Sequence, residues 1–361
     1  MTPLETEIRR IIAFDGPISV SDYMRFCLGH PKYGYYVTRD PLGPLGDFTT
    51  APEISQMFGE LIGAWAATVW EQMGAPERVN VVELGPGRGT LMADALRAAK
   101  ALPEFRAAIS VHLVEMSDVL AAKQREALAF LGVPVVWHRD VRDIPEGPSL
   151  FLANEFFDAL PVSHYVRSHQ GWHERVVTVG NDDRLAFAVK SVPMLNFEKA
   201  FASRIEGATP GAIIEHRSAA YALEVTRHLE SFGGAALIID YGYTRSQFGE
   251  TLQAVRGQTY VAVLTDPGEV DLTAHVDFAE LAHAGRASGA HVHGPITQGN
   301  FLRRLGIAER AARLKQNATP QQAADIDVAL ARLTAPDQMG ELFKVLAIAD
   351  PKLGSLPGFD R

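Results

Sequence analysis

The chain has 361 residues, of which 47% are hydrophobic and 21% are charged, which is the composition of a globular protein with a substantial core. Its formal net charge of −9 argues against a general nucleic-acid binder, because phosphate contacts need clustered Lys and Arg. The single cysteine, Cys27, excludes an internal disulfide and a zinc site built from cysteines. Neither a membrane-span pattern nor a signal-peptide core is found, so we expect a cytoplasmic protein without membrane insertion.

The first part of the chain predicts helices followed by a loop. Apolar spacing predicts two short helices over residues 4–13 and 19–29, joined by the turn Asp15-Gly16-Pro17. Residues 31–55 are rich in tyrosine, proline and glycine, which favours a structured loop over a helix or a strand.

The end of this loop has the pattern of a helix start. Thr50 and Glu53 have the spacing of a capping box, with Pro52 in the first turn, so we expect both to cap a helix that carries its apolar face over residues 54–69. Asp47 has no comparable structural reason for its place in the loop. We therefore keep Asp47 as a candidate functional residue.

A strand, a glycine-rich turn and a helix follow. Residues 79–84 form an apolar run of strand type, and residues 90–99 favour a helix rich in alanine and leucine. Between them Gly85, Gly87 and Gly89 can adopt positive φ and let the main chain approach a ligand closely. Glycines at alternate positions do not fit the G-x-G-x-x-G of dinucleotide-binding proteins, which disfavours a dehydrogenase.

Two further strands bring polar side chains to the same edge of the predicted sheet. Residues 110–115 form a strand that ends in Glu115, where parallel α/β sheets place the carboxylate that binds two ribose hydroxyls. The alternative is a Glu that faces solvent at a strand end. A helix over residues 118–131 and a strand over 133–137 continue the α/β pattern.

The fourth strand, residues 149–153, runs directly into the sequence NEFFDALP over residues 154–161. Polar residues at the carboxyl end of a central strand are where open α/β sheets place their chemistry. The alternative is that Glu155 and Asp158 only favour a helix N-terminus through its dipole. Because two acids flank two phenylalanines, we expect a binding role.

The rest of the chain predicts an insertion and a return to the α/β pattern. Residues 162–192 alternate like β-hairpins, a helix is expected over residues 214–232, and the strand that follows ends in Asp240. His291 and His293 share one strand face, but a third ligand is not evident nearby in the sequence. We therefore expect structural histidines and no metal ion.

Eight stretches of the chain resemble one protein family in sequence and in order. They are GYY (34–36), GDFTTAPEIS (46–55), ELGPGRGT (83–90), NEFFDALP (154–161), IDYGY (239–243), DLTAHVDF (271–278), TQGNF (297–301) and MGELFKVL (339–346). Together they resemble the MidA-like family of class I S-adenosylmethionine-dependent methyltransferases, to which the mitochondrial complex I assembly arginine methyltransferase belongs.

The resemblance implies a fold and a division of the chain. It implies an α/β, Rossmann-like seven-stranded sheet with an N-terminal helical and loop extension and inserted β-hairpin and helical elements. We expect residues 1–75 to pack on a methyltransferase core formed by residues 76–161 and 233–361. Residues 162–232 are then inserted elements that cover the substrate.

The resemblance also implies S-adenosylmethionine as the cofactor. In this family the acid at the end of the first strand helps to hold the amino end of the cofactor, and the Asp140-Val141 position often contacts its adenine. Carried over by motif, the expected cofactor-binding residues are Thr50, Glu83, Gly85, Pro86, Gly87, Gly89, Glu115, Asp140, Val141 and Asn154.

The implied acceptor is a protein arginine. A guanidinium is protonated in water and is a poor nucleophile, but carboxylates that grip it bidentately leave one nitrogen in place to attack. We assign this task to Glu155 and Asp158, with Asp47 and Asp240 as further candidates. The resemblance allows a respiratory complex I subunit as the partner and a homodimer as the assembly. The alternatives are a small-molecule methyltransferase and a methyltransferase-like assembly protein that does not catalyse transfer.

Overall fold

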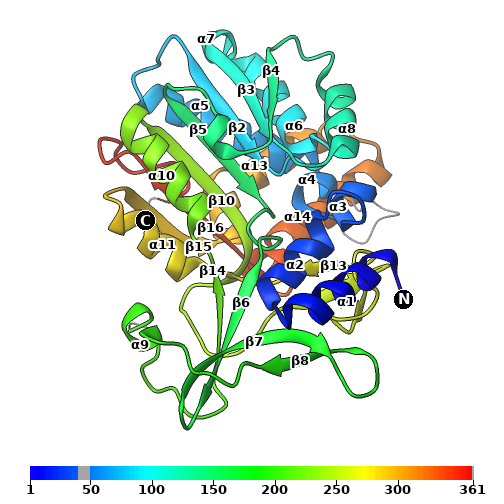
Figure 1. Cartoon of the computed structure of the whole chain (residues 1–361). Coiled ribbons are helices and arrows are strands. Elements are labelled where there is room, and N and C mark those ends of the chain that lie inside the picture. Colours follow the sequence, from blue (N-terminus) through cyan, green and yellow to red (C-terminus); the bar gives the residue numbers. More distant parts are fainter. Residues whose placement is uncertain (40–48, 203, 360–361) are drawn as a thin grey trace.

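The computed structural model describes residues 1–39, 49–202 and 204–359, and its centre is a sheet covered by helices on both faces (Figure 1). Within these residues the sheet has eight strands: seven follow the order β15-β16-β10-β5-β2-β3-β4, and β14 pairs with β10. The strands are β2 (Val79–Leu84), β3 (Ile109–Val114), β4 (Val135–His138), β5 (Ser149–Asn154), β10 (Gly234–Tyr243), β14 (Val276–Asp277), β15 (His291–Thr297) and β16 (Phe343–Ala349). The predicted α/β fold is confirmed, and β14 adds one strand to the predicted seven.

The direction of the strands decides where a ligand can bind. The five neighbours β10, β5, β2, β3 and β4 are parallel, whereas β16 runs antiparallel to both β10 and β15. The carboxyl ends of the five parallel strands therefore meet at one edge of the sheet. In open α/β sheets this edge is where ligands bind.

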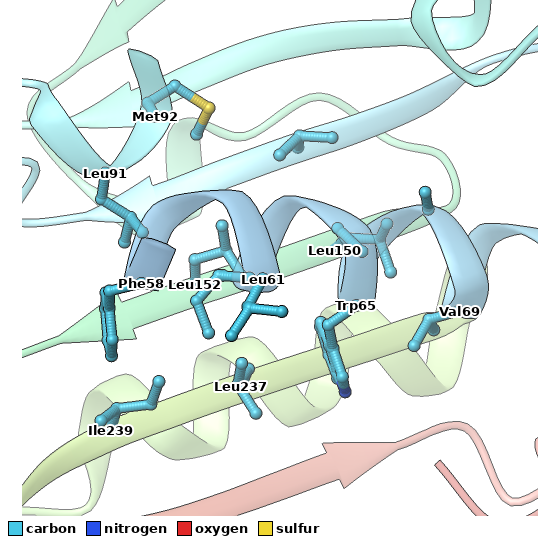
Figure 2. Close-up of a cluster of buried hydrophobic side chains, with 14 of the residues drawn as sticks. Phe58, Leu61, Trp65, Val69, Leu91, Met92, Leu150, Leu152, Leu237 and Ile239 are labelled. Atoms are coloured by element: carbon cyan, nitrogen blue, oxygen red, sulfur yellow. The ribbon is translucent and has the colours of Figure 1, made fainter. Parts of the chain in front are cut away.

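The two faces of the sheet are built by alternate residues of each strand. Leu150 and Leu152 of β5 pack with Phe58 and Trp65 on one face, as Figure 2 shows, whereas Phe151 belongs to the core of the other face. Burial of each such side chain stabilises the fold by about 1.5–3 kcal/mol. The helices are α5 (Gln56–Gln72) and α6 (Thr90–Ala98) on the first face, and α10 (Ala220–Phe232) and α11 (Phe278–Ala287) on the second.

A second sheet lies below the central sheet in the view of Figure 1. Its strands are antiparallel and follow the order β1-β7-β6-β9, with β8 paired to β7. They are β1 (Ile18–Ser19), β6 (Val162–Ser168), β7 (Gly171–Val179), β8 (Leu185–Val189) and β9 (Ile213–Arg217). The hairpins predicted over residues 162–192 are confirmed. The helix predicted from residue 214 is wrong at its start, because Ile213–Arg217 pairs with β6 and α10 begins at Ala220.

A small third sheet, in the order β12-β11-β13, packs against the first helices. Its strands are β11 (Gln253–Arg256), β12 (Thr259–Val261) and β13 (Asp271–Thr273). The first helices are α1 (Pro3–Asp15) and α2 (Val20–Gly29), which share an apolar core with β13 through Leu4, Met24 and Leu272. This packing holds β13 beside α2, close to the edge where the parallel strands end.

Further helices complete the fold, and the helix over residues 320–334 packs on the same face of the sheet as α5. They are α3 (Tyr35–Thr38), α4 (Ala51–Ile54), α7 (Pro103–Ala108), α8 (Asp118–Leu128), α9 (Phe197–Ala200), α12 (Gln298–Arg304), α13 (Ile307–Lys315), α14 (Pro320–Thr334), α15 (Met339–Leu342) and the 3₁₀ turns η1 (Ala99–Ala101) and η2 (Val141–Asp143). Among the described residues, no helix has the length and hydrophobicity of a membrane crossing, and no group of three or more metal-ligating side chains is present.

Candidate active site

A cavity of about 260 Å³ lies where the parallel strands end. The ends of β2, β3, β5 and β10 contribute Glu83, Glu115, Asn154 and Tyr241 to its lining. Side chains from α2, α3 and α4 line it as well. The cavity thus occupies the position that this class of sheet uses for ligands.

The glycine turn after β2 forms one wall of this cavity. Gly85, Gly87 and Gly89 all have positive φ, at 64°, 56° and 83°. A Cβ on Gly85 would lie 2.9 Å from Cδ2 of Phe156, so a larger residue would displace that ring. Gly85 and Gly87 line the cavity, whereas Gly89 lies where α6 begins and packs against Gln124. The turn therefore needs glycine both for its conformation and for the space it leaves.

Glu83 gives this wall an unpartnered acceptor. Its side chain is 3% exposed, and its Oε2 has no hydrogen-bond partner among the described residues. Burial, together with the charge of Glu115, raises the pKa of Glu83 to about 8. A buried carboxylate without a partner is costly, and a cationic ligand in the cavity would relieve that cost. The ammonium group of S-adenosylmethionine fits this requirement.

Glu115 is held beside the glycine turn by Gln124. The Oε1 of Glu115 accepts from the Ser117 N–H at 2.7 Å, and its Oε2 accepts from Nε2 of Gln124 at 3.0 Å. The same Nε2 donates to the Gly87 carbonyl at 2.8 Å, and the Gln124 Oε1 accepts from the Trp137 indole at 2.9 Å. Burial raises the pKa of Glu115. Gln124 has no recognisable signature in the sequence, because an amide within a helix gives no local signal of a long-range contact.

Glu155 enters the cavity from a strained main chain at the end of β5. Its φ is 51°, which an L residue rarely adopts, and its N–H donates to the Ile239 carbonyl at 2.9 Å. Its Oε1 accepts from the Ala51 N–H at 3.0 Å and from Nδ2 of Asn154 at 3.3 Å. Burial raises the pKa of Glu155 to about 8. Glu155 thus joins the fourth strand to α4 while its carboxyl group lines the cavity.

Asp158 lines the cavity, and Asp240 lies behind it. The Oδ2 of Asp240 accepts from the main-chain N–H of Phe157 at 3.0 Å and of Asp158 at 3.2 Å. Asp240 is fully buried and does not line the cavity, so the structure makes it the support of the turn that carries Asp158. Burial raises the pKa of both carboxyls, and for Asp240 the charges of Asp158 and Glu155 raise it further.

Arg217 of β9 lies against the same turn. Its guanidinium donates to the main-chain carbonyls of Asp158, Leu160, Ala274 and His275 at 2.9 to 3.3 Å. Its charge lowers the pKa of Asp158 and of Asp240 against the effect of burial. Arg217 therefore ties the second sheet to the turn after β5 and adds a positive charge beside its acids.

The structure locates the other predicted site residues in different ways. Thr50 and Pro86 line the cavity. Asp140 caps η2 and accepts from the Arg142 N–H at 2.9 Å, and Val141 is buried in the core, so neither lines the cavity. Asp47 lies outside the described residues.

The predicted capping box is wrong. Thr50 occupies the N-cap position of α4, but its side chain makes no capping hydrogen bond there. The carboxylate of Glu53 instead accepts from the Thr90 hydroxyl at 2.5 Å, at the start of α6. The apolar helix begins later than predicted, at Gln56, and Ser55 caps it. Glu53 thus links α4 to the helix that follows the glycine turn.

The lining residues that were not assigned a role from the sequence include Tyr36, Tyr241, Asp271 and Thr273. All four belong to stretches that carry the family resemblance, GYY, IDYGY and DLTAHVDF. The resemblance was therefore the available signal, although it could not say that these three stretches meet at one cavity.

Comparison with known proteins agrees with this site. The family described as "Putative S-adenosyl-L-methionine-dependent methyltransferase" matches residues 61–296. A protein from Burkholderia thailandensis, whose crystal structure holds S-adenosyl-homocysteine, has 30% sequence identity and a TM-score of 0.86, with 99% of this chain and 94% of that chain covered. A second structure from the same organism has a TM-score of 0.83 at 30% identity over the same shares.

Curated relatives are similar over almost the full chain. "Protein arginine methyltransferase NDUFAF7, mitochondrial" of Mus musculus is 38% identical over 96% of this chain and 84% of its own length. The Drosophila melanogaster homologue of that name is 36% identical over the same shares. These relatives are named as mitochondrial, so the predicted cytoplasmic location is wrong. The chain belongs to the family of S-adenosylmethionine-dependent methyltransferases that its sequence resembles, and S-adenosylmethionine is its cofactor.

Proposed function

We propose that this methyltransferase modifies arginine side chains of proteins. The observation that carries the proposal is the pair of carboxyl groups, Glu155 and Asp158, that line the cavity beside the glycine turn. The curated relatives named as protein arginine methyltransferases support the same acceptor. A guanidinium is planar, always charged and rich in N–H donors, so it matches carboxylates better than a neutral acceptor would.

The residues of the β2 and β3 ends would hold the cofactor. Gly85 and Gly87 leave space for it, Glu83 offers an acceptor to its ammonium group, and Glu115 offers one to its ribose. When bound, S-adenosylmethionine supplies an electrophilic methyl group on its sulfonium. Transfer is an in-line displacement, so the main task of the protein is to position the two reactants.

Glu155 and Asp158 have distinct places in this proposal. The Oε1 of Glu155 already accepts from Ala51 and Asn154, so Oε2 is the oxygen that would meet the acceptor. Asp158 lines the cavity on the same turn, three residues further along. Bidentate contacts from carboxylates would draw the guanidinium charge to one side and leave one nitrogen in place for the methyl group.

The natural partner and the assembly are also part of the proposal. The resemblance to the complex I assembly methyltransferase favours a subunit of respiratory complex I as the acceptor, and a homodimer as the assembly. We also propose that residues 162–232 help to cover the acceptor, because Arg217 of β9 contacts the turn that carries Asp158.

Two measurements, made one after the other, test the proposal. Calorimetric titration with S-adenosylmethionine should show saturable one-site binding to the wild type, and Gly87→Val should abolish it because the added side chain fills the cavity. The protein is then incubated with methyl-labelled S-adenosylmethionine and a cell extract heated to inactivate its own enzymes. Label in methylarginine after hydrolysis, absent with Gly87→Val, is the expected result. Label only in small molecules or in other residues would contradict the arginine acceptor.

A further inference from the structure

The cavity has a second polar wall that lies beyond β5 from the glycine turn. In the sheet, β5 separates β10 from β2, so Tyr241 of β10 and the turn after β2 lie on opposite sides of β5. Asp271 and Thr273 of β13 and Tyr36 of α3 line the cavity with Tyr241 (elements labelled in Figure 1). Three segments that are far apart in the sequence thus meet at this wall.

Two tyrosine–aspartate pairs form the wall. The Tyr36 hydroxyl hydrogen-bonds to the Asp271 carboxylate, and the Tyr241 hydroxyl lies close to the Asp158 carboxylate. Thr273 in turn hydrogen-bonds to Tyr241. Each tyrosine also lies within the electrostatic reach of the other carboxylate. Burial raises the pKa of both tyrosines well above their ordinary value, so both stay neutral donors that hold the carboxylates in place.

The buried charge of this wall favours a cation. Asp158 and Asp271 are only 6% and 2% exposed, yet both line the cavity. The nearby Arg217 donates its N–H groups to four main-chain carbonyls. Two desolvated carboxylates attract a cationic side chain through charge-assisted hydrogen bonds.

The several N–H donors of a guanidinium suggest a role for Asp271. A guanidinium has five N–H donors, and one carboxylate pairs with two of them along one edge, so carboxylates on different sides of the cavity can pair with different edges. Glu155 and Asp158 follow β5, whereas Asp271 reaches the cavity from β13 in a different sheet. From this geometry we infer that Asp271, held by Tyr36, is a specificity-determining residue that binds the cationic side chain of the acceptor. This inference rests on the proposed arginine acceptor.

The test uses a small probe, because the natural acceptor is not identified. The full-length protein, saturated with S-adenosyl-homocysteine, is titrated calorimetrically with N-acetyl-arginine methylamide. The citrulline analogue, which has the same shape but no charge, is the matched ligand. The wild type should bind the arginine probe and not the citrulline probe. Asp271→Asn should weaken arginine binding by about 10–100-fold and leave the affinity for S-adenosyl-homocysteine within about twofold, because one charged hydrogen-bond partner is lost.

Two further variants make the result decisive. Asp266→Asn removes a carboxylate of the same segment that pairs with Arg256 and does not line the cavity, so it should bind the arginine probe as the wild type does. Tyr36→Phe removes only the hydroxyl that holds Asp271, and should weaken the binding of the arginine probe by about 3–10-fold. If Asp271→Asn fails to bind S-adenosyl-homocysteine, Tyr36→Phe decides the outcome in its place.

The outcomes separate this inference from the proposed function. Unchanged arginine binding by Asp271→Asn would overturn the role of Asp271 and leave the arginine acceptor standing. Where Tyr36→Phe decides, unchanged binding by that variant overturns the role in the same way. A wild type that does not prefer arginine to citrulline would overturn both.

Discussion

The carboxylate of Asp240 accepts a hydrogen bond from the main-chain N–H of Phe157 at 3.0 Å, which joins the end of β10 to the turn after β5. The N–H groups of Asp158 at 3.2 Å and of Tyr241 at 2.9 Å reach the same carboxylate. Three N–H groups from two segments therefore converge on one fully buried side chain. The positions of Glu155 and Asp158 depend on this contact, because both lie on the turn that Asp240 holds.

Asp240→Asn should reduce both stability and activity, although the Asp240 side chain does not line the cavity. The amide keeps one acceptor oxygen but turns an NH₂ group toward N–H donors, so at least one buried donor loses its partner. We expect a loss of about 1–3 kcal/mol in the free energy of unfolding. We also expect a fall in kcat larger than the change in the Kd of S-adenosylmethionine. Urea denaturation and steady-state kinetics measure the two effects.

The matched control for Asp240 is Asp183→Asn. Asp183 is a largely exposed carboxylate, 84% accessible at the side chain, that pairs with Arg9. Surface pairs of this kind contribute about 0–1 kcal/mol, so the control should be nearly silent. Equal effects of the two variants would refute the supporting role of Asp240.

Gly85→Ala should weaken the binding of S-adenosylmethionine. The new Cβ would lie 2.9 Å from the Phe156 ring, at a φ of 64° that costs an L residue about 1–2 kcal/mol. Gly16→Ala is the control, since Gly16 has a φ of 89° and has no atom within 4 Å of the added Cβ. Both variants should lose stability in a thermal melt, but only Gly85→Ala should raise the Kd in calorimetry. An unchanged Kd would show that the turn has room for a side chain.

Methylation of an arginine acceptor should depend on pH through Glu155. Its pKa is raised to about 8 by burial, so below that pH the carboxyl group is mostly protonated and cannot pair with a guanidinium. We therefore expect kcat/KM to rise as the pH increases through about 8. Glu155→Gln should abolish transfer at every pH while retaining cofactor binding. Full activity of that variant would exclude Glu155 from catalysis.

The ligand-free protein should lose stability as the pH rises, because of Glu83. The pKa of this group is about 8 in the folded state against 4.5 as its ordinary value, so the folded state holds a proton that the unfolded state has released. The stabilisation is complete below about pH 4.5 and is lost as the pH rises through about 8. Thermal melts from pH 5 to 9 should show a falling Tm. Glu83→Gln should reduce the slope, although Glu155 contributes in the same direction.

Local patterns predicted the strands of the central sheet well, because each strand is short, apolar and bounded by turn residues. The start of α10 was missed for a non-local reason. The predicted helix includes Ile214 and Glu215, but in the fold Ile214 lies opposite Tyr165 and Glu215 opposite His164 of β6. The partner strand lies about fifty residues away in the sequence, so the local pattern does not show where the strand ends and the helix begins.

The lining of the cavity was predictable where it follows from position on a strand. Glu83, Glu115 and Glu155 stand at or just after strand ends, and parallel strands bring those ends together. Residues whose place depends on contacts between distant segments were not predictable. Asp271 reaches the cavity only because β13 packs beside α2. Asp240 is separated from the cavity by the turn after β5, which its carboxylate supports.

Strand β16 has a consequence for how the protein is made. It lies between β10 and β15 and pairs with both, although it comes later in the chain than either. During synthesis, the glycine turn and the parallel strands can assemble early, but one edge of β10 stays open until residues 343–349 arrive. An exposed strand edge invites pairing with other chains. The nascent chain should therefore depend on chaperones at this late stage, and premature termination before residue 343 should yield aggregates.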